Sequence, residues 1–159
     1  MKQRIRIFDT NTYSSYKHKI KPSDVEISAL SIVVFYELTA TKISSKKRRL
    51  WDGYFRHHQT NHTLIIPAQE DWRICSQIVW QMHRNGENIP KTATAFQNDA
   101  LICQSAISWH LENPAERPPC AVITENLKHF SLIADYLNKR LKRNEPKLIV
   151  VSAKDYFSV

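Results

Sequence analysis

The stretch RIRIFDTNT, residues 4–12, decides the predicted fold of this chain. It alternates polar and apolar residues and then turns apolar at Ile7 and Phe8, which predicts a first strand that ends at Asp9. Asp9 and residues 10–12 are of types that begin helices, so a short polar helix is expected to run to about Lys19. A strand that passes directly into a helix is typical of an α/β protein.

The alternation of strand and helix continues along the rest of the chain. After a break at residues 22–24, further strands are expected at 25–29, 63–67, 121–124 and 148–151, and helices at 30–41, 44–62, 69–84, 95–111 and 131–143. This order predicts an α/β fold with a mostly parallel sheet and helices on both of its faces. The length of 159 residues favours one domain, 1–159.

Composition excludes several classes of function. The only glycines are Gly53 and Gly86, too few and too far apart for a dinucleotide-binding fingerprint, a phosphate-binding P-loop or a serine nucleophile elbow. The formal net charge of +8 favours a polyanionic partner. Nucleic acid is the commonest such partner, and an acidic protein fits equally well.

Cysteine content and hydropathy indicate the compartment. The three cysteines lie far apart, which predicts reduced thiols in the core. The N-terminus has no apolar signal-peptide core, and the longest apolar run, 32–36, is far shorter than the ~20 residues of a membrane span. We therefore expect a cytoplasmic protein that contacts no membrane.

Three acidic residues occupy positions where a carboxylate is costly. Asp9 follows an apolar strand, at the end where open α/β sheets bind ligands, whereas Glu37 and Asp99 share helical faces with apolar residues. Two carboxylates ~6 Å apart repel by ~3 kcal/mol at an effective dielectric constant of ~20. If the three converge, a divalent cation that prefers oxygen, Mg²⁺ or Mn²⁺, offsets the repulsion.

Each acid also has a purely structural interpretation. Asp9 can be the N-cap of the following helix, Glu37 can pair with a nearby Lys or Arg, and Asp99 can pair with an Arg across the core. All three being structural is the less economical explanation.

Four segments in this order resemble the PIN-domain ribonuclease family, and in particular the VapC-type toxins of type II toxin–antitoxin systems. They are Phe8–Asn11, Ser28 together with Glu37–Leu38, Asn98–Ile102 and Val122–Phe130, and together they span most of the chain. The resemblance implies a PIN-like three-layer α/β/α domain with a central parallel sheet of about five strands. It also implies Mg²⁺- or Mn²⁺-dependent cleavage of single-stranded RNA, a cognate antitoxin bound near the acidic pocket, and a homodimer.

The resemblance further implies roles for individual residues. Asp9 and Asp99 become direct metal ligands, and Glu37 becomes a ligand or holds a metal-bound water. Asn11 and Thr124 become the residues that orient Asp9 and the waters.

Asn126 departs from the family pattern. It stands where many relatives have a fourth catalytic acid, and its amide supplies an oxygen without a charge, so a second metal ion is expected to bind more weakly. The structural alternative for Asn126 is a helix N-cap. His129 is expected to be a packing or surface residue.

A basic stretch interleaved with aromatic residues lies within the predicted helix 44–62. One interpretation is an RNA contact, with base stacking on the aromatic rings, and a second is a contact with the antitoxin. The third is an amphipathic helix with rings inward and charges in solvent. The basic residues concerned are Lys46, Lys47, Arg48 and Arg49, and the aromatic ones are Trp51, Tyr54 and Phe55.

Three other functions compete with that of a toxin nuclease. A catalytically weak or inactive PIN-like module that binds RNA or protein is favoured by Asn126. An RNA-processing nuclease that is not a toxin keeps the same chemistry. A basic structural subunit that binds an acidic protein would not need the three acidic residues Asp9, Glu37 and Asp99.

Three tryptophans at helical positions are expected in the core or in a dimer interface. They are Trp72, Trp80 and Trp109.

Overall fold

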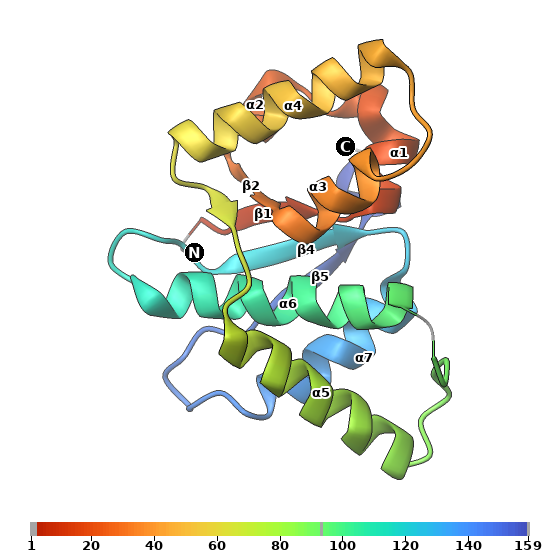
Figure 1. Ribbon diagram of the computed structural model, residues 1–159. Helices are drawn as coiled ribbons and strands as arrows, with labels where there is room; N and C mark the ends of the chain where they lie inside the picture. The colour runs from red at the N-terminus through yellow and green to blue at the C-terminus, as the bar shows by residue number, and fades with distance from the viewer. Residues whose placement is uncertain (1–2, 93, 159) are drawn as a thin grey trace.

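The centre of the molecule is a parallel sheet of five strands in the order β3-β2-β1-β4-β5 (Figure 1). The structure is a computed structural model that describes residues 3–92 and 94–158. The strands are β1 (Ile5–Phe8), β2 (Ser28–Ser31), β3 (Leu64–Ile65), β4 (Cys120–Thr124) and β5 (Ile149–Ser152).

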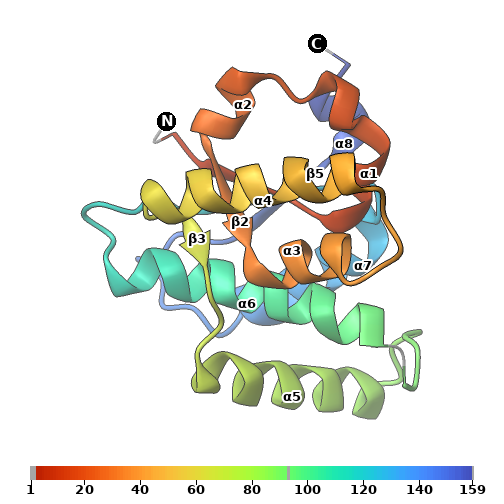
Figure 2. The same cartoon turned by 45° about the horizontal axis from the view of Figure 1, so that its top comes forward.

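Helices cover both faces of this sheet. Figures 1 and 2 show α2 and α4 on one side and α6 and α7 on the other, with α5 packed outside α6. The three-layer α/β/α arrangement around a parallel five-stranded sheet, predicted from the sequence, is therefore confirmed. The helices are α1 (Thr10–Tyr16), the short 3₁₀ helix η1 (Lys17–Lys19), α2 (Pro22–Glu26), α3 (Ile32–Thr39), α4 (Ser45–Thr60), α5 (Gln69–Arg84), α6 (Thr94–Glu112), α7 (Leu127–Asn138) and α8 (Ala153–Tyr156).

Burial on both faces explains the sequence of the strands. Every residue of β2 and β4 is buried, and Ile7 and Phe8 of β1 lie in the same core. A parallel sheet covered by helices on both sides favours apolar residues facing both layers, and the sequence CAVIT of β4 shows this most clearly. The three cysteines are buried and unoxidised, as expected.

Some predicted boundaries are wrong. The strand expected at 25–29 is instead the helix α2 followed by β2, because Pro22 occupies the first turn of α2 and Asp24 accepts a hydrogen bond of 2.8 Å from the backbone N–H of Lys21. Helix α3 begins only at Ile32, where the Ser31 hydroxyl accepts a hydrogen bond from the N–H of Val33. The helix expected at 131–143 begins at Leu127 and ends at Asn138.

The strand order reverses at the centre of the sheet, and this reversal predicts where a ligand site would lie. The chain adds β2 and β3 on one side of β1 and β4 and β5 on the other. In open α/β sheets, ligands bind where the carboxyl ends of two such strands diverge. Asp9 directly follows the carboxyl end of β1, and Thr124 is the last residue of β4. The two strands are aligned so that Phe8 pairs with Ile123.

Among residues 3–92 and 94–158, no helix is both long enough and apolar enough to cross a bilayer.

Candidate active site

An acidic pocket of about 220 Å³ lies at the carboxyl edge of the sheet, where β1 and β4 diverge. Four of the predicted catalytic residues line it from four different elements: Asp9 after β1, Glu37 on α3, Asp99 on α6 and Asn126 before α7. The chain thus brings together carboxylates that are far apart in sequence. Asn11, Thr10 and His129 also line this pocket, and Pro90, Ala95 and Phe96 form its apolar wall.

Asp9 is held by both of its carboxylate oxygens. The backbone N–H of Thr12 donates to Oδ1 at 2.8 Å, and the Thr124 hydroxyl donates to Oδ2 at 2.7 Å. Asp9 is therefore the N-cap of α1 and a lining residue of the pocket at once. Burial raises the pKa of Asp9 above its usual value, and the hydrogen bonds from Thr12 and Thr124 offset part of that rise.

Glu37 is half-buried and lacks a cationic partner. Its Oε1 atom is buried without a hydrogen-bond partner among the described residues, and none of the ion pairs in that part of the chain includes it. Among the described residues, Glu37 therefore does not form the ion pair with Lys or Arg that the structural interpretation predicted. Burial raises the pKa of Glu37, the charge of Asp9 acts in the same direction, and the nearby Thr10 hydroxyl opposes both.

Asp99 has the most perturbed carboxyl of the pocket. Burial, followed by the charges of Asp9 and Glu37, raises the pKa of Asp99 to about 8. Across residues 3–92 and 94–158, no arginine pairs with it. A carboxyl whose pKa is raised by burial and by neighbouring carboxylates marks a place where a cation would be strongly favoured.

Asn126 and His129 form a hydrogen-bonded pair in the pocket. Asn126 occupies the N-cap position of α7, yet its side chain does not cap the helix. Its Nδ2 atom lies 2.9 Å from Nδ1 of His129, whose ring packs edge-on against Phe96. His129 was expected to be a packing or surface residue, and its place in the pocket was missed. The signal was its spacing, because residues three apart on a helix are neighbours.

The residues that orient Asp9 differ in part from the predicted ones. Thr124 is fully buried and makes the expected contact. Asn11 is exposed and lines the pocket, but within the described part of the chain it forms no hydrogen bond with Asp9. Thr12, which was not predicted, supplies the backbone donor, and its hydroxyl donates to the carbonyl of Ile123 at 3.0 Å.

The amphipathic-helix interpretation of the basic stretch holds for its aromatic residue Trp51. Trp51 is buried, and its ring centroid lies 5.5 Å from that of Tyr13, so it offers no stacking surface to an RNA base. Arg48 forms a surface ion pair with Asp52 at 3.2 Å. The predicted contact residues Lys46, Lys47, Arg48 and Arg49 are all exposed near the start of α4.

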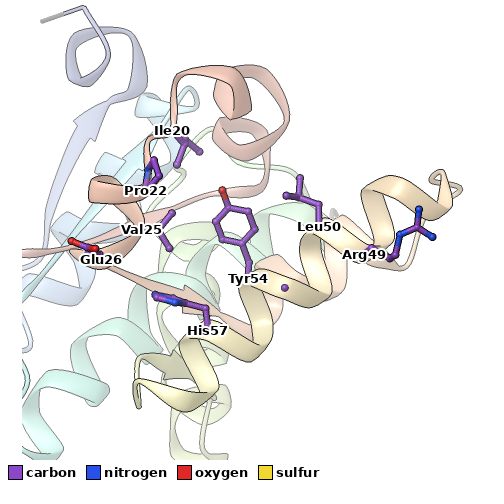
Figure 3. Close-up of a pocket in the computed structure, with 9 residues that line it drawn as sticks. Ile20, Pro22, Val25, Glu26, Arg49, Leu50, Tyr54 and His57 are labelled. Atoms are coloured by element: carbon purple, nitrogen blue, oxygen red, sulfur yellow. The ribbon is translucent and has the colours of Figure 1, made fainter.

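A larger, mostly apolar groove of about 550 Å³ lies between α2 and α4 (Figure 3). Ile20, Pro22, Val25, Leu50 and Tyr54 provide most of its surface, and Arg49, Glu26 and His57 lie at its polar margins. It shares no lining residue with the acidic pocket. The sequence does not predict this groove, because the strand expected at 25–29 leaves no helix opposite α4, whereas α2 is a helix in the structure.

The exposed tryptophans correct another expectation. Trp109 is buried, but Trp72 and Trp80 on α5 are 60% and 58% exposed, so they are not core residues of this chain. They line a second groove of about 420 Å³ together with Val79 and Leu101. The dimer-interface alternative for these two residues stays a prediction.

The chemistry of the acidic pocket suits a hard divalent cation that keeps part of its water shell. Among residues 3–92 and 94–158, no group of three or more His, Cys, Asp or Glu side chains is arranged as a ready-made metal site. Mg²⁺ commonly binds through one or two carboxylates and several waters, so it does not need such a cage. The unpartnered Glu37 oxygen and the unneutralised carboxyls fit that mode of binding.

One solved structure shares this architecture. No family model and no curated protein matches the sequence. The crystal structure of VapBC2 from Rickettsia felis, bound to a DNA fragment from the promoter, contains a chain that is 21% identical, with a TM-score of 0.52 over 93% of this chain and 98% of that one. VapBC-1 from nontypeable Haemophilus influenzae gives 15% identity and a TM-score of 0.49, over 94% and 98%. The first likeness spans nearly the whole of both chains, and this chain therefore has the PIN-like fold of a chain in the VapBC2 complex.

Proposed function

We propose that the chain is a divalent-metal-dependent endoribonuclease, a VapC-type PIN-domain toxin of a type II toxin–antitoxin pair. The observation that carries this proposal is the acidic pocket, where Asp9, Glu37 and Asp99 meet without a cationic side chain to neutralise them. The fold shared with a chain of VapBC2 supports the same assignment.

Mg²⁺ or Mn²⁺ is the cofactor that this donor set favours. Asp9 and Asp99 would hold the ion directly, and Glu37 would bind it or one of its waters through the buried oxygen that has no protein partner among the described residues. When bound, the ion would polarise the scissile phosphodiester and lower the pKa of a water molecule.

The chain itself positions the reacting groups. Thr12 and Thr124 fix both oxygens of Asp9, so this carboxylate enters the reaction in one orientation. His129 engages the Asn126 amide nitrogen, which leaves the amide oxygen of Asn126 as an acceptor toward water or substrate. Phe96 and Pro90 form the apolar wall that limits access of bulk water.

We infer that single-stranded RNA reaches the pocket along the exposed basic start of α4, residues 46–49. The net charge of +8 supports attraction of RNA, and the burial of Trp51 favours contacts with phosphates over base stacking. These contacts need a compartment that contains RNA, and the predicted cytoplasmic location meets that need.

A cognate antitoxin is the second proposed partner. The apolar groove between α2 and α4 offers a preformed site for the apolar side chains of a peptide, with Arg49 available to an acidic residue (Figure 3). The VapBC2 neighbour, a complex by its name, supports such a partner. We further infer a homodimer, which the two exposed tryptophans of α5 support as apolar contact surface.

Induced expression tests the toxin function directly. The wild-type chain should arrest growth, whereas the Asp9→Asn variant, produced at the same level, should not. Growth arrest by both would assign toxicity to something other than catalysis. RNA binding without arrest or cleavage would favour the inactive binding module instead.

A further inference from the structure

A second pocket adjoins the acidic pocket and has the opposite chemical character. It measures about 260 Å³ and shares Thr10 and Glu37 with the acidic pocket, so the two cavities meet at these residues. Lys17 of η1 and Lys47 of α4 also line it. We call this cavity the lysine pocket; its other lining residues include Ser14, Thr41 and Trp51.

The two lysines of this pocket are available to an anion. Within the described ranges, neither lysine takes part in an ion pair, and neither contributes to the shifted pKa of Glu37. The ammonium group of Lys17 lies 5.9 Å from the centroid of the Trp51 ring, a cation–π contact that holds it at the cavity. Two lysines from separate elements thus face one cavity beside a cluster of carboxylates.

This juxtaposition suits a polynucleotide, in which phosphates follow one another along the backbone. A phosphodiester that reacts in the acidic pocket is covalently tied to a neighbouring phosphate, which the carboxylates repel. A cavity with two lysines that adjoins the acidic pocket would offset that repulsion for the neighbouring phosphate. An isolated phosphate monoester would need no second cavity of this kind.

We infer that the lysine pocket binds the phosphate adjacent to the scissile one in single-stranded RNA, through Lys17 and Lys47. The inference rests on the proposed nuclease function and deepens it. Trp51 and Tyr13 are only 5% and 1% exposed, so they offer no open ring for base stacking, and the two ammonium groups are the cations that the pocket presents. It therefore recognises the backbone and carries little sequence preference.

The helix that supplies Lys17 also supplies a matched control. Lys19 is an exposed residue of η1, two positions after Lys17, and lines neither the lysine pocket nor the acidic pocket. Lys17→Ala and Lys19→Ala remove the same charge from nearby positions, so they change the long-range attraction of RNA to a similar extent. Only Lys17→Ala removes a group from the cavity.

The test uses a set of single-stranded RNA oligonucleotides. In each oligonucleotide one phosphodiester linkage, between two 2′-deoxy nucleotides, is replaced by a neutral methylphosphonate. The control oligonucleotide has the same two 2′-deoxy nucleotides joined by an ordinary phosphodiester. Binding by fluorescence anisotropy and metal-dependent cleavage are measured separately. Lys17→Ala and Lys47→Ala should each weaken binding on the order of tenfold, and Lys19→Ala less than about threefold. One neutral linkage, next to the cleaved one, should weaken binding to the wild type, have a smaller effect on each single variant, and have no further effect when Lys17 and Lys47 are both replaced by Ala.

Equal effects of Lys17→Ala and Lys19→Ala, or a neutral linkage that weakens binding to all variants alike, would overturn the inference. So would variants that keep full RNA affinity and lose only antitoxin binding, because the pocket would then be a protein site. If the wild type cleaves no RNA but still shows the position-specific loss of binding, the nuclease proposal fails and the phosphate site stands.

Discussion

The hydroxyl of Thr124 donates a hydrogen bond of 2.7 Å to Oδ2 of Asp9 and so joins the carboxyl ends of β1 and β4. The same hydroxyl oxygen accepts a hydrogen bond of 2.9 Å from the backbone N–H of Asn126. One buried side chain thus links the acid after β1 to the turn that presents Asn126. The link explains how residues far apart in the sequence keep a fixed geometry at the point where the strand order reverses.

Removal of the Thr124 hydroxyl should lower the rate of RNA cleavage by more than the loss of folding stability accounts for. Thr124→Val leaves the Asp9 oxygen and the Asn126 N–H without their partner, and we expect a loss of about 1–3 kcal/mol in the free energy of unfolding. RNA cleavage at saturating metal should fall about 10- to 100-fold. Thr124→Ser keeps the hydroxyl and should retain most of the activity. Equal cleavage by the Val and Ser variants in a kinetic assay would exclude a positioning role.

The stability of the metal-free protein should fall as the pH rises. The pKa of Asp99 is raised from 3.8 to about 8, so between these values the folded chain holds a proton that the unfolded chain has released. The stabilisation is fully present below pH 4 and is lost as the pH rises through about 8. Asp9 and Glu37, whose pKa values are also raised, act in the same direction.

Urea denaturation in EDTA from pH 5 to pH 9 measures this dependence. Asp99→Asn should flatten the slope and make the metal-free protein more stable at high pH, and Mg²⁺ should flatten the wild-type slope by favouring the ionised form. A wild-type free energy of unfolding that rises over the same range would contradict the coupling of these carboxyls.

Asn126→Asp should strengthen metal binding. The substitution adds a fourth carboxylate to the acidic pocket, and we expect affinity for Mn²⁺ to rise on the order of tenfold, or about 1.4 kcal/mol, by isothermal titration calorimetry. Without metal the variant should be less stable, because it adds a like charge near Asp9 and Asp99. Unchanged metal affinity together with unchanged stability would show that Asn126 lies outside the metal environment.

The groove between α2 and α4 should be needed for neutralisation by the antitoxin and not for catalysis. Leu50→Arg places a charge in the apolar lining shown in Figure 3, so growth arrest should persist when the antitoxin is co-expressed. Gln59→Arg, an exposed position on the same helix outside the groove, is the control and should still be neutralised. Rescue of Leu50→Arg as complete as that of the control would place the antitoxin elsewhere.

Much of the fold could be predicted from local pattern. The helix at 69–84 was predicted with its exact bounds, because its apolar stripe ends at Asn85 and Gly86. The segment 22–31 could not be predicted correctly, since Val25 and Ile27 alternate like a strand, although Pro22 and Asp24 begin a helix. There the local capping interactions outweighed the apparent periodicity.

The acids of the site and the supporting residue Thr124 could be predicted from the sequence, but the other supporting groups could not. Asp9, Glu37 and Asp99 stood out because each interrupts an apolar pattern. Thr12 acts through its backbone N–H, which any residue could supply, so no side-chain signal marked it. The convergence of Lys17 with Lys47 depends on how η1 packs near α4, a tertiary relationship with no local trace.

Cleavage of a labelled single-stranded RNA by the purified chain, with Mg²⁺ or Mn²⁺ and with EDTA, tests the proposed chemistry most directly. The wild type should cleave only with the metal present, and Asp9→Asn and Asp99→Asn should keep the wild-type circular dichroism spectrum while losing at least about 10²-fold in rate. Cleavage that persists in EDTA, or wild-type rates in both variants, would show that the carboxylates of the acidic pocket do not hold the metal that drives this reaction.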